Sequence, residues 1–359
     1  MSSSYCDLNA FLQRHRERWQ QPLCLLAPPA ELQLSALSAP VALSLSADWR
    51  QVLQAQQQGI AAQLVGETFD PLSTPSHPLL FWPKAKEEGF WWLEQALAHW
   101  PSLDLVGDNH SGLKAVAKNL AQAGLSIHKV DTAKRTSLYR LQLSDQPTQD
   151  LALIRTLAPV AKATQWQTED QLTLISRPGV FSHGRLDEGS ALLLEVWRER
   201  LQEPTSQQLG QARPKQLLDL GCGCGLLGGW LLKHYASAAQ LCATDVNGLA
   251  LAATQATLAA NGLQGEVLPS DIYSSLDGRR FDWIVSNPPF HTGQRTDYSL
   301  AERLIREAPQ HLHPQGELWL VANRFLPWPE LLEASFGQYQ EYAQDGRYAV
   351  YWARGGQIR

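Results

Sequence analysis

Two short segments in the second half of the chain place polar side chains directly after stretches of apolar residues. The first is LLDLGCGCG at residues 217–225, in which Asp219 precedes three alternate glycines, Gly221, Gly223 and Gly225. Glycines after a strand allow a tight turn whose backbone N–H groups reach a ligand. Asp219 is placed to accept a hydrogen bond from a ligand's ammonium group. The segment therefore predicts a cofactor-binding turn.

A second acid, Asp245, lies 20 residues after Gly225, at the end of the next apolar stretch. An acidic side chain at this position suits the ribose diol of a nucleoside-containing cofactor. Nicotinamide cofactors are bound by the same pattern. These residues alone therefore leave a hydride transferase open as an interpretation.

The second segment, SNPPF at residues 286–290, separates the two interpretations. The Asn287 side chain and the Pro288 carbonyl offer two acceptors for one amine, and the proline rings of Pro288 and Pro289 stiffen the loop. Phe290 offers a face on which a planar group can stack. A hydride transferase has no need of this arrangement, whereas an enzyme that methylates an exocyclic amine does. We therefore predict that these four residues are catalytic rather than a plain strand terminator.

Alternating strand and helix signals surround both segments. Strands are expected over residues 216–220, 240–244, 266–269, 281–286, 317–322 and 347–353, and helices over 226–234, 248–260 and 300–311. Strands at this spacing, joined by helices, are typical of an α/β fold with a parallel doubly wound sheet.

The first half of the chain repeats this order without its chemistry. Strands are expected over residues 22–27, 41–46, 79–82, 103–107 and 137–143, and helices over 49–58 and 90–100. Pro28-Pro29-Ala30 stands where the glycine turn would be, and Trp82-Pro83-Lys84 stands in place of SNPPF. A turn without glycine cannot bring its backbone close to a cofactor. The first half therefore resembles a degenerate copy of the second.

This pattern predicts two tandem Rossmann-like domains. The degenerate one is expected over residues 1–150, where it gives structural support. The catalytic one is expected over 165–359. The linker is placed within 144–163, where Pro, Thr and Gln residues cluster.

Composition narrows the class of protein further. The chain has 359 residues, 44% hydrophobic and 18% charged, and a net charge of −5. These values exclude a globally disordered chain and a protein that binds nucleic acid through a surface that is basic overall. Five cysteines form no disulfide framework and suit a reducing compartment. No apolar run approaches the length of a membrane span, so we expect a cytoplasmic protein with no membrane association.

Two further groups of residues could bind a ligand. Cys222 and Cys224 have the C-x-C spacing of a metal-binding pair. No second pair of ligands lies nearby in the sequence, so we expect no metal. We expect the two side chains to pack as small fillers of the glycine turn. Basic residues cluster within residues 128–140 and could contact phosphate or form an ordinary solvated face. The candidates for RNA contact are Lys129, Lys134, Arg135 and Arg140.

Taken together, the motifs resemble the class I S-adenosylmethionine-dependent methyltransferases that modify amino groups. PGVFS at residues 178–182, followed by LDEGSALLL at 186–194, is similar to the signature of ribosomal RNA guanine-N2 methyltransferases. Further strings resemble the small-subunit methyltransferase C family: FWPK at 81–84, VGDNHSG at 106–112, KVD at 129–131, LAANG at 258–262, VAN at 321–323 and FLP at 325–327. The resemblance covers residues 20–355 and is most specific over 178–328. One departure is HGR at 183–185, in place of an acid-Gly pair.

The resemblance implies roles for individual residues. Asp219 and the three alternate glycines would hold the methionine portion of S-adenosylmethionine, and Asp245 would hold its ribose. Asp271 would accept from the adenine amine. Asn287 and the Pro288 carbonyl would accept from the N2 amine of a guanine flipped out of its stack, with Phe290 against the base.

The resemblance also implies a substrate, which is 16S rRNA in the small ribosomal subunit, and a monomeric enzyme. It further implies that the first domain, residues 1–150, binds RNA or the ribosomal subunit. Three alternatives stay open at this point. The first is the sister enzyme of large-subunit (23S) rRNA, which has the same motifs. The second is a protein-glutamine methyltransferase, although such enzymes favour Tyr after Asn-Pro-Pro and lack a degenerate twin domain. The third is a non-catalytic RNA-binding assembly factor.

Overall fold

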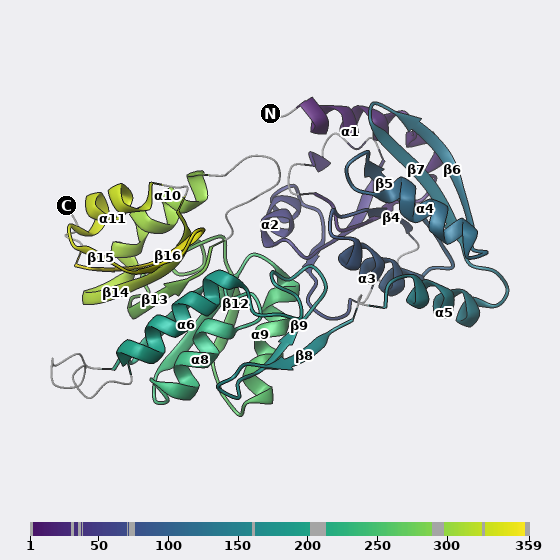
Figure 1. Cartoon of the computed structure of the whole chain (residues 1–359). Helices are drawn as coiled ribbons and strands as arrows, with labels where there is room; N and C mark the ends of the chain where they lie inside the picture. Colours follow the sequence, from purple (N-terminus) through teal and green to yellow (C-terminus); the bar gives the residue numbers. More distant parts are fainter. Residues whose placement is uncertain are drawn as a thin grey trace. The chain divides into compact units, whose positions relative to one another are not determined.

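A computed structural model of the chain describes residues 3–29, 32–34, 37, 39–69, 71, 76–159, 162–201, 213–288, 298–324 and 327–355. The chain forms two compact units (Figure 1). The first comprises Met1–Ala163 and Arg177–Gly179, and the second comprises Thr164–Ser176 and Val180–Arg359.

The first unit is built on a seven-stranded sheet in the order β3-β2-β1-β4-β5-β7-β6. Its strands are β1 (Leu23–Leu26), β2 (Val41–Ser46), β3 (Ala62–Leu64), β4 (His77–Phe81), β5 (Ser102–Asp108), β6 (Ser126–Ala133) and β7 (Thr136–Gln142). Its α-helices are α1 (Ser3–Gln13), α2 (Trp49–Gln57), α3 (Lys86–Leu97), α4 (Leu113–Gln122) and α5 (Pro147–Leu157).

The second unit has a seven-stranded sheet in the order β12-β11-β10-β13-β14-β16-β15. Its strands are β10 (Gln216–Leu220), β11 (Gln240–Asp245), β12 (Glu266–Pro269), β13 (Phe281–Ser286), β14 (Leu312–Asn323), β15 (Tyr339–Gln344) and β16 (Tyr348–Arg354). Its α-helices are α6 (Glu188–Leu201), α8 (Leu226–His234), α9 (Gly248–Ala260), α10 (Tyr298–Glu307) and α11 (Trp328–Phe336). A separate two-stranded sheet pairs β8 (Thr164–Gln167) with β9 (Thr173–Ser176).

The two large sheets correspond strand for strand in their order, which confirms the prediction of two tandem α/β domains. The first five strands of the second sheet are parallel, as expected of a doubly wound sheet, whereas β16 runs antiparallel to both β14 and β15 at one edge. The reason is the short connection between β15 and β16, since a tight turn can join only antiparallel neighbours. Asp345 holds that turn by accepting from the backbone N–H groups of Arg347 and Tyr348, each at 2.6 Å.

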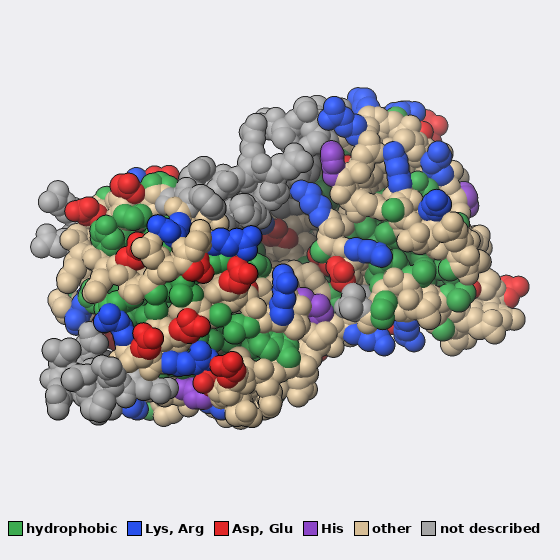
Figure 2. All heavy atoms as spheres, in the orientation of Figure 1, with side chains coloured by type: hydrophobic (Ala, Val, Ile, Leu, Met, Phe, Trp, Pro, Cys, Tyr) green, Lys and Arg blue, Asp and Glu red, His purple; other side chains and the backbone are tan. Residues whose placement is uncertain are grey.

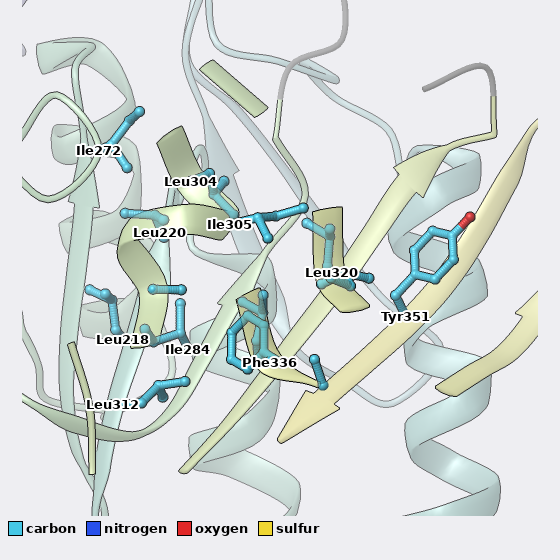
Figure 3. Packing of buried hydrophobic residues seen from close by; sticks show 14 of the residues in the cluster. Leu218, Leu220, Ile272, Ile284, Leu304, Ile305, Leu312, Leu320, Phe336 and Tyr351 are labelled. Atoms are coloured by element: carbon cyan, nitrogen blue, oxygen red, sulfur yellow. The ribbon is translucent and has the colours of Figure 1, made fainter. Parts of the chain in front are cut away.

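Helices cover both faces of the second sheet (Figure 1). On one face, Leu218, Ile284 and Leu320 from three parallel strands pack against Ile305 of α10 and Phe336 of α11 (Figure 3). The helices α6, α8 and α9 lie on the other face. Strands that are buried on both faces are almost continuously apolar, and β10 and β13 can therefore be predicted from the sequence.

The segment expected to contain the linker, residues 144–163, is helical over α5, and the change from the first to the second unit comes at its end, after Ala163. Pro147 occupies the first turn of α5, where its missing N–H is harmless, and Ile154 is buried. Asp150 accepts from the backbone N–H of Ser144 at 2.6 Å, which fixes the chain entering the helix. The helix packs against α3 and α4 and belongs to the first unit.

Charged side chains of both signs are interspersed over the visible face of each unit (Figure 2). Among the described residues, no helix combines the length and apolar character needed to cross a membrane.

Candidate active site

The carboxyl ends of β10, β11, β12 and β13 meet at one edge of the second sheet, where ligands bind in open α/β sheets. Gly221, Gly223 and Gly225 follow β10 and have φ values of 73°, 56° and 78°. These left-handed values need glycine, and a Cβ at Gly221 or Gly223 would touch nothing. The N–H groups of Gly221 and Cys222 both donate to the Thr244 carbonyl at 2.8 and 2.9 Å, so β11 holds the turn.

Asp245 ends β11 directly beside the glycine turn. Its Oδ2 accepts from the Gly223 N–H at 3.0 Å, and its Oδ1 accepts from the Asn247 N–H at 2.9 Å. The structure therefore brings Asp245 to the turn, as the spacing predicts. Its carboxylate also shapes the loop in which a ribose would lie.

Asp219 is buried beneath the turn, with a side chain that is 1% exposed. Its Oδ2 accepts from the Gly228 N–H in the first turn of α8 at 2.8 Å. Within the described parts of the chain, its Oδ1 has no hydrogen-bond partner. Burial raises the pKa of Asp219 to about 7, and the charge of Asp245 adds to this rise. An unsatisfied buried carboxyl oxygen is expensive, so this atom would favour a cationic ligand.

Asn287 follows β13, whose last residue, Ser286, donates from its hydroxyl to the Leu220 carbonyl at 2.7 Å. That bond ties the end of β13 to the end of β10 and brings Asn287 to the glycine turn. Its Nδ2 donates to Oδ1 and Oδ2 of Asp187 at 3.2 and 3.3 Å and to Ser190 Oγ at 2.9 Å. The two hydrogens of the amide nitrogen thus have acceptors, so only the amide oxygen could accept a hydrogen bond from a substrate amine.

The chain matches two family descriptions in tandem: Methyltransferase small domain N-terminal over residues 10–154 and Methyltransferase small domain over residues 171–352. It is 41% identical to the ribosomal RNA small subunit methyltransferase C of Chromohalobacter salexigens over 95% of this chain and 96% of that protein. It is 38% identical to the protein of the same name from Sodalis glossinidius, over 98% and 95% of the two chains.

The chain belongs to the ribosomal RNA small subunit methyltransferase C family.

A solved structure of similar fold is the T. thermophilus 16S rRNA N2 G1207 methyltransferase in complex with AdoMet and guanosine. The two structures have a TM-score of 0.74 at 26% identity, covering 97% of this chain and 91% of that one. The family and the class I methyltransferase fold expected from the sequence are therefore confirmed.

Asp271, which the resemblance places at the adenine amine, follows β12. Its Oδ2 accepts from Nη1 of Arg303 at 3.1 Å, and its N–H donates to Ser274 Oγ at 3.0 Å. The next residue, Ile272, has a φ of 56°, which is rare for a β-branched side chain and marks a strained turn. An adenine amine would share the Asp271 carboxylate with Arg303, a residue to which the sequence reasoning gave no role.

The structure describes some of the remaining predicted site residues and not others. Pro288 is buried directly after Asn287, whereas Pro289 and Phe290 lie outside the described residues. Burial raises the pKa of Cys222 well above its ordinary value and that of Cys224 to about 12, so both thiols are protonated fillers of the turn. The described residues contain no cluster of side chains that could hold a metal ion.

Asp187 and Ser190 cannot be identified as site residues from the sequence. The string LDEGS at residues 186–190 carries a resemblance to the family signature but no local sign of a role. A contact between residues about 100 positions apart has no local pattern, so only the tertiary structure reveals it.

In the first unit of this methyltransferase C chain, a tryptophan occupies the position of Asn287. Trp82 comes one residue after β4, whose Phe81 pairs with Val106, just as Asn287 comes one residue after Ser286, which pairs with Leu320. The Trp82 side chain is buried and packs edge-on against Phe90 at 5.5 Å between ring centroids. A buried indole ring thus occupies the position that the Asn287 amide has in the second unit.

The four basic candidates fall into different surroundings. Lys134 and Arg135 form the exposed tip of the β6–β7 hairpin, both with positive φ (48° and 63°), and Lys129 is exposed on β6. Arg140 instead donates from Nη2 to the buried Asp104 at 3.1 Å. Although burial alone would raise the pKa of Asp104, hydrogen bonds from His77, Arg140 and Trp19 hold it well below its usual range. Arg140 is therefore committed to an internal ion pair.

Proposed function

We propose that this chain transfers the methyl group of S-adenosylmethionine to the exocyclic N2 amine of a guanine in 16S rRNA. Membership of the methyltransferase C family supports the reaction and the substrate. The observation that carries the assignment to residues is Asn287, whose amide nitrogen is held by Asp187 and Ser190 so that its oxygen is presented as an acceptor.

The residues at the sheet edge suit this cofactor. S-adenosylmethionine carries an ammonium and a sulfonium, and the buried, unpartnered Oδ1 of Asp219 favours a cation nearby. Asp245 provides a carboxylate acceptor for a ribose diol beside the glycine turn. We therefore assign Asp219 and the turn to the methionine portion, Asp245 to the ribose and Asp271 to the adenine.

The chain's own groups perform orientation rather than covalent chemistry. When bound, the cofactor supplies a methyl group on a sulfonium, which is a good leaving group. Asn287 Oδ1 and the Pro288 carbonyl accept the two N2 hydrogens and aim the nitrogen lone pair at the methyl carbon. The N2–carbon bond forms as the sulfur–carbon bond breaks, sulfur keeps the electron pair, and the resulting ammonium releases its proton to water. No general base is assigned.

The first unit has a different proposed role. Trp82 fills the position of the amide acceptor, so we assign this unit no transfer chemistry. We propose that residues 1–150 support the catalytic domain over 165–359 and bind RNA, with Lys129, Lys134 and Arg135 as the contacts. We further propose that the protein is a metal-free monomer acting on the small ribosomal subunit in the cytoplasm, where that substrate lies.

The test is single-turnover methyl transfer to small ribosomal subunits that lack the modification, with the product nucleoside mapped in both rRNAs. Asn287→Ala removes the acceptor but leaves the cofactor groups in place. We expect its rate to fall by about 10²- to 10³-fold, with cofactor affinity nearly unchanged. The rate of Asn287→Asp should also fall, because this variant places a second carboxylate next to that of Asp187.

The matched control is Asn109→Ala, which changes an exposed asparagine after β5 of the first unit and should keep the parental rate. Parental activity in Asn287→Ala would make the segment a strand terminator only. N2-methylguanosine found solely in 23S rRNA would refute the assigned substrate.

A further inference from the structure

The start of α6 is organised by one carboxylate. Oδ1 of Asp187 accepts from the backbone N–H groups of Gly189 and Ser190 at 3.0 and 3.1 Å, and its carbonyl accepts from Ala191 N–H at 2.9 Å. This is the bonding of a helix N-cap, which satisfies donors that have no partner within the helix.

The same carboxylate holds the amide of Asn287. An amide nitrogen has two hydrogens, and here it has two acceptors, the Asp187 carboxylate at 3.2–3.3 Å and Ser190 Oγ at 2.9 Å. A flipped amide would turn Oδ1 toward the carboxylate, where two acceptors would repel. The pair of contacts therefore selects one of the two amide orientations.

Packing keeps the two acceptors in place. Ser190 is 5% exposed, and a Cβ added at Gly189 would lie 3.2 Å from the Tyr348 ring, so α6 sits directly on the start of β16. Glu188 accepts from Nη1 of Arg347, the residue directly before that strand, at 2.9 Å. A side chain fixed from a helix seated on a sheet is held more closely than one supported by a loop.

We propose that Asp187 and Ser190 are positioning residues for methyl transfer, acting through Asn287; the proposal rests on the function assigned above. They set the amide oxygen toward the N2 amine. The negative charge of Asp187 also polarises the amide through a charge-assisted hydrogen bond, which strengthens the oxygen as an acceptor while positive charge develops on N2.

The first test compares Ser190→Ala with Ser190→Thr. The alanine variant removes one acceptor of the amide, whereas threonine keeps the hydroxyl. We expect the single-turnover rate of Ser190→Ala to fall about tenfold while cofactor affinity and thermal midpoint stay near parental values, and we expect Ser190→Thr to retain most of the rate.

The second test removes the charge and keeps the cap. In Asp187→Asn the side-chain oxygen still accepts from the α6 N–H groups, but the new amide donor faces Asn287 Nδ2. We expect a rate about tenfold to hundredfold lower. Asp48→Asn is the control, because Asp48 caps α2 through Arg50 N–H at 2.9 Å in the first unit and should leave the rate unchanged.

A double-mutant cycle separates positioning from folding support. If Asp187 acts through Asn287, Asp187→Asn costs nothing further in an Asn287→Ala background. In addition, the Asn287→Asp, Asp187→Asn double variant exchanges donor and acceptor and should recover activity over Asn287→Asp alone.

The outcomes distinguish this inference from the proposed function. If Asn287→Ala is slow but Asp187→Asn and Ser190→Ala keep the parental rate, the positioning role is refuted and the catalytic role of Asn287 stands. Equal losses from Asp187→Asn with and without Asn287 would make Asp187 a structural cap only. Parental activity of Asn287→Ala itself would refute the proposed site.

Discussion

Cofactor affinity should depend on pH because of Asp219. The carboxyl group is buried, one oxygen accepts from Gly228 N–H, and the other has no partner among the described residues. Burial, with the nearby charge of Asp245, raises its pKa to about 7. In the free protein, the carboxyl group is therefore largely protonated at pH 6 and largely ionised at pH 7.5.

The magnitude follows from the fraction of ionised protein. With a pKa near 7, about 9% of Asp219 is ionised at pH 6 and about 76% at pH 7.5. A cofactor with an ammonium and a sulfonium binds the ionised form better. If binding requires that form, the dissociation constant falls about eightfold over this interval as pH rises. The cofactor's own amino group, with an ordinary pKa of about 7.7–8.0, is largely protonated up to pH 7 and partly deprotonated at pH 7.5, so the rise in affinity reports Asp219 most cleanly between pH 6 and pH 7.

Isothermal titration calorimetry measures this directly. S-adenosylmethionine is titrated into the full chain at pH 6.0, 6.75 and 7.5, in two buffers of different ionisation enthalpy. We expect tighter binding at higher pH and release of close to one proton at pH 6. Asp219→Asn keeps an acceptor for Gly228 N–H but cannot titrate, so its affinity should be flat over the same range.

Two results would refute this reasoning. An affinity that does not change between pH 6 and 7.5 would mean that Asp219 is ionised throughout or is not sensed by the cofactor. An equal slope in Asp219→Asn would assign the linkage to another group.

Three other predictions concern residues of the cofactor turn and of the first unit. Asp245→Ala should weaken cofactor binding by about 1.5–3 kcal/mol, because a ribose loses a charged acceptor and Gly223 N–H loses its partner, and calorimetry against Asp245→Asn checks this. Lys134→Ala with Arg135→Ala should raise the apparent KM for subunits and flatten its salt dependence. Arg140→Ala should instead destabilise the first unit by about 1.5–3 kcal/mol in denaturant unfolding, because the buried Asp104 loses one charged partner while His77 and Trp19 remain bonded to it. An unchanged salt dependence of KM in the Lys134→Ala, Arg135→Ala variant would contradict the RNA contacts. Unchanged stability of Arg140→Ala would contradict the internal ion pair.

Three parallel strands of the second sheet, β10, β12 and β13, could be predicted to the residue. The central strands β10 and β13 are short buried apolar runs, and glycine, proline or asparagine marks where each strand ends, so burial and turn chemistry give the same boundaries. The residues at those ends, including Asp219, Asp245 and Asn287, were predictable because the carboxyl ends of parallel strands meet.

Features that depend on tertiary contacts were not predictable. The edge strand β15 is largely polar and only partly buried, so it carries little periodic signal. The helix α5 was not predicted because its segment is rich in Gln and Thr. It is stabilised by packing against α3 and α4. The basic side chains of the first unit looked equivalent in sequence, and only the position of Asp104 sets Arg140 apart.

The contact between Trp82 and Gly89 bears on how the two halves can diverge. A Cβ added at Gly89 would lie 2.6 Å from the Trp82 ring, so the indole fits only because α3 carries no side chain there. Replacing Trp82 with a small amide would leave a cavity costing about 3–5 kcal/mol, and filling the cavity from Gly89 first would clash with the ring. Each change alone therefore destabilises the first unit, and a polar acceptor at position 82 would need a second change that refills the core. The packing around Trp82 thus disfavours a residue like Asn287 at this strand end.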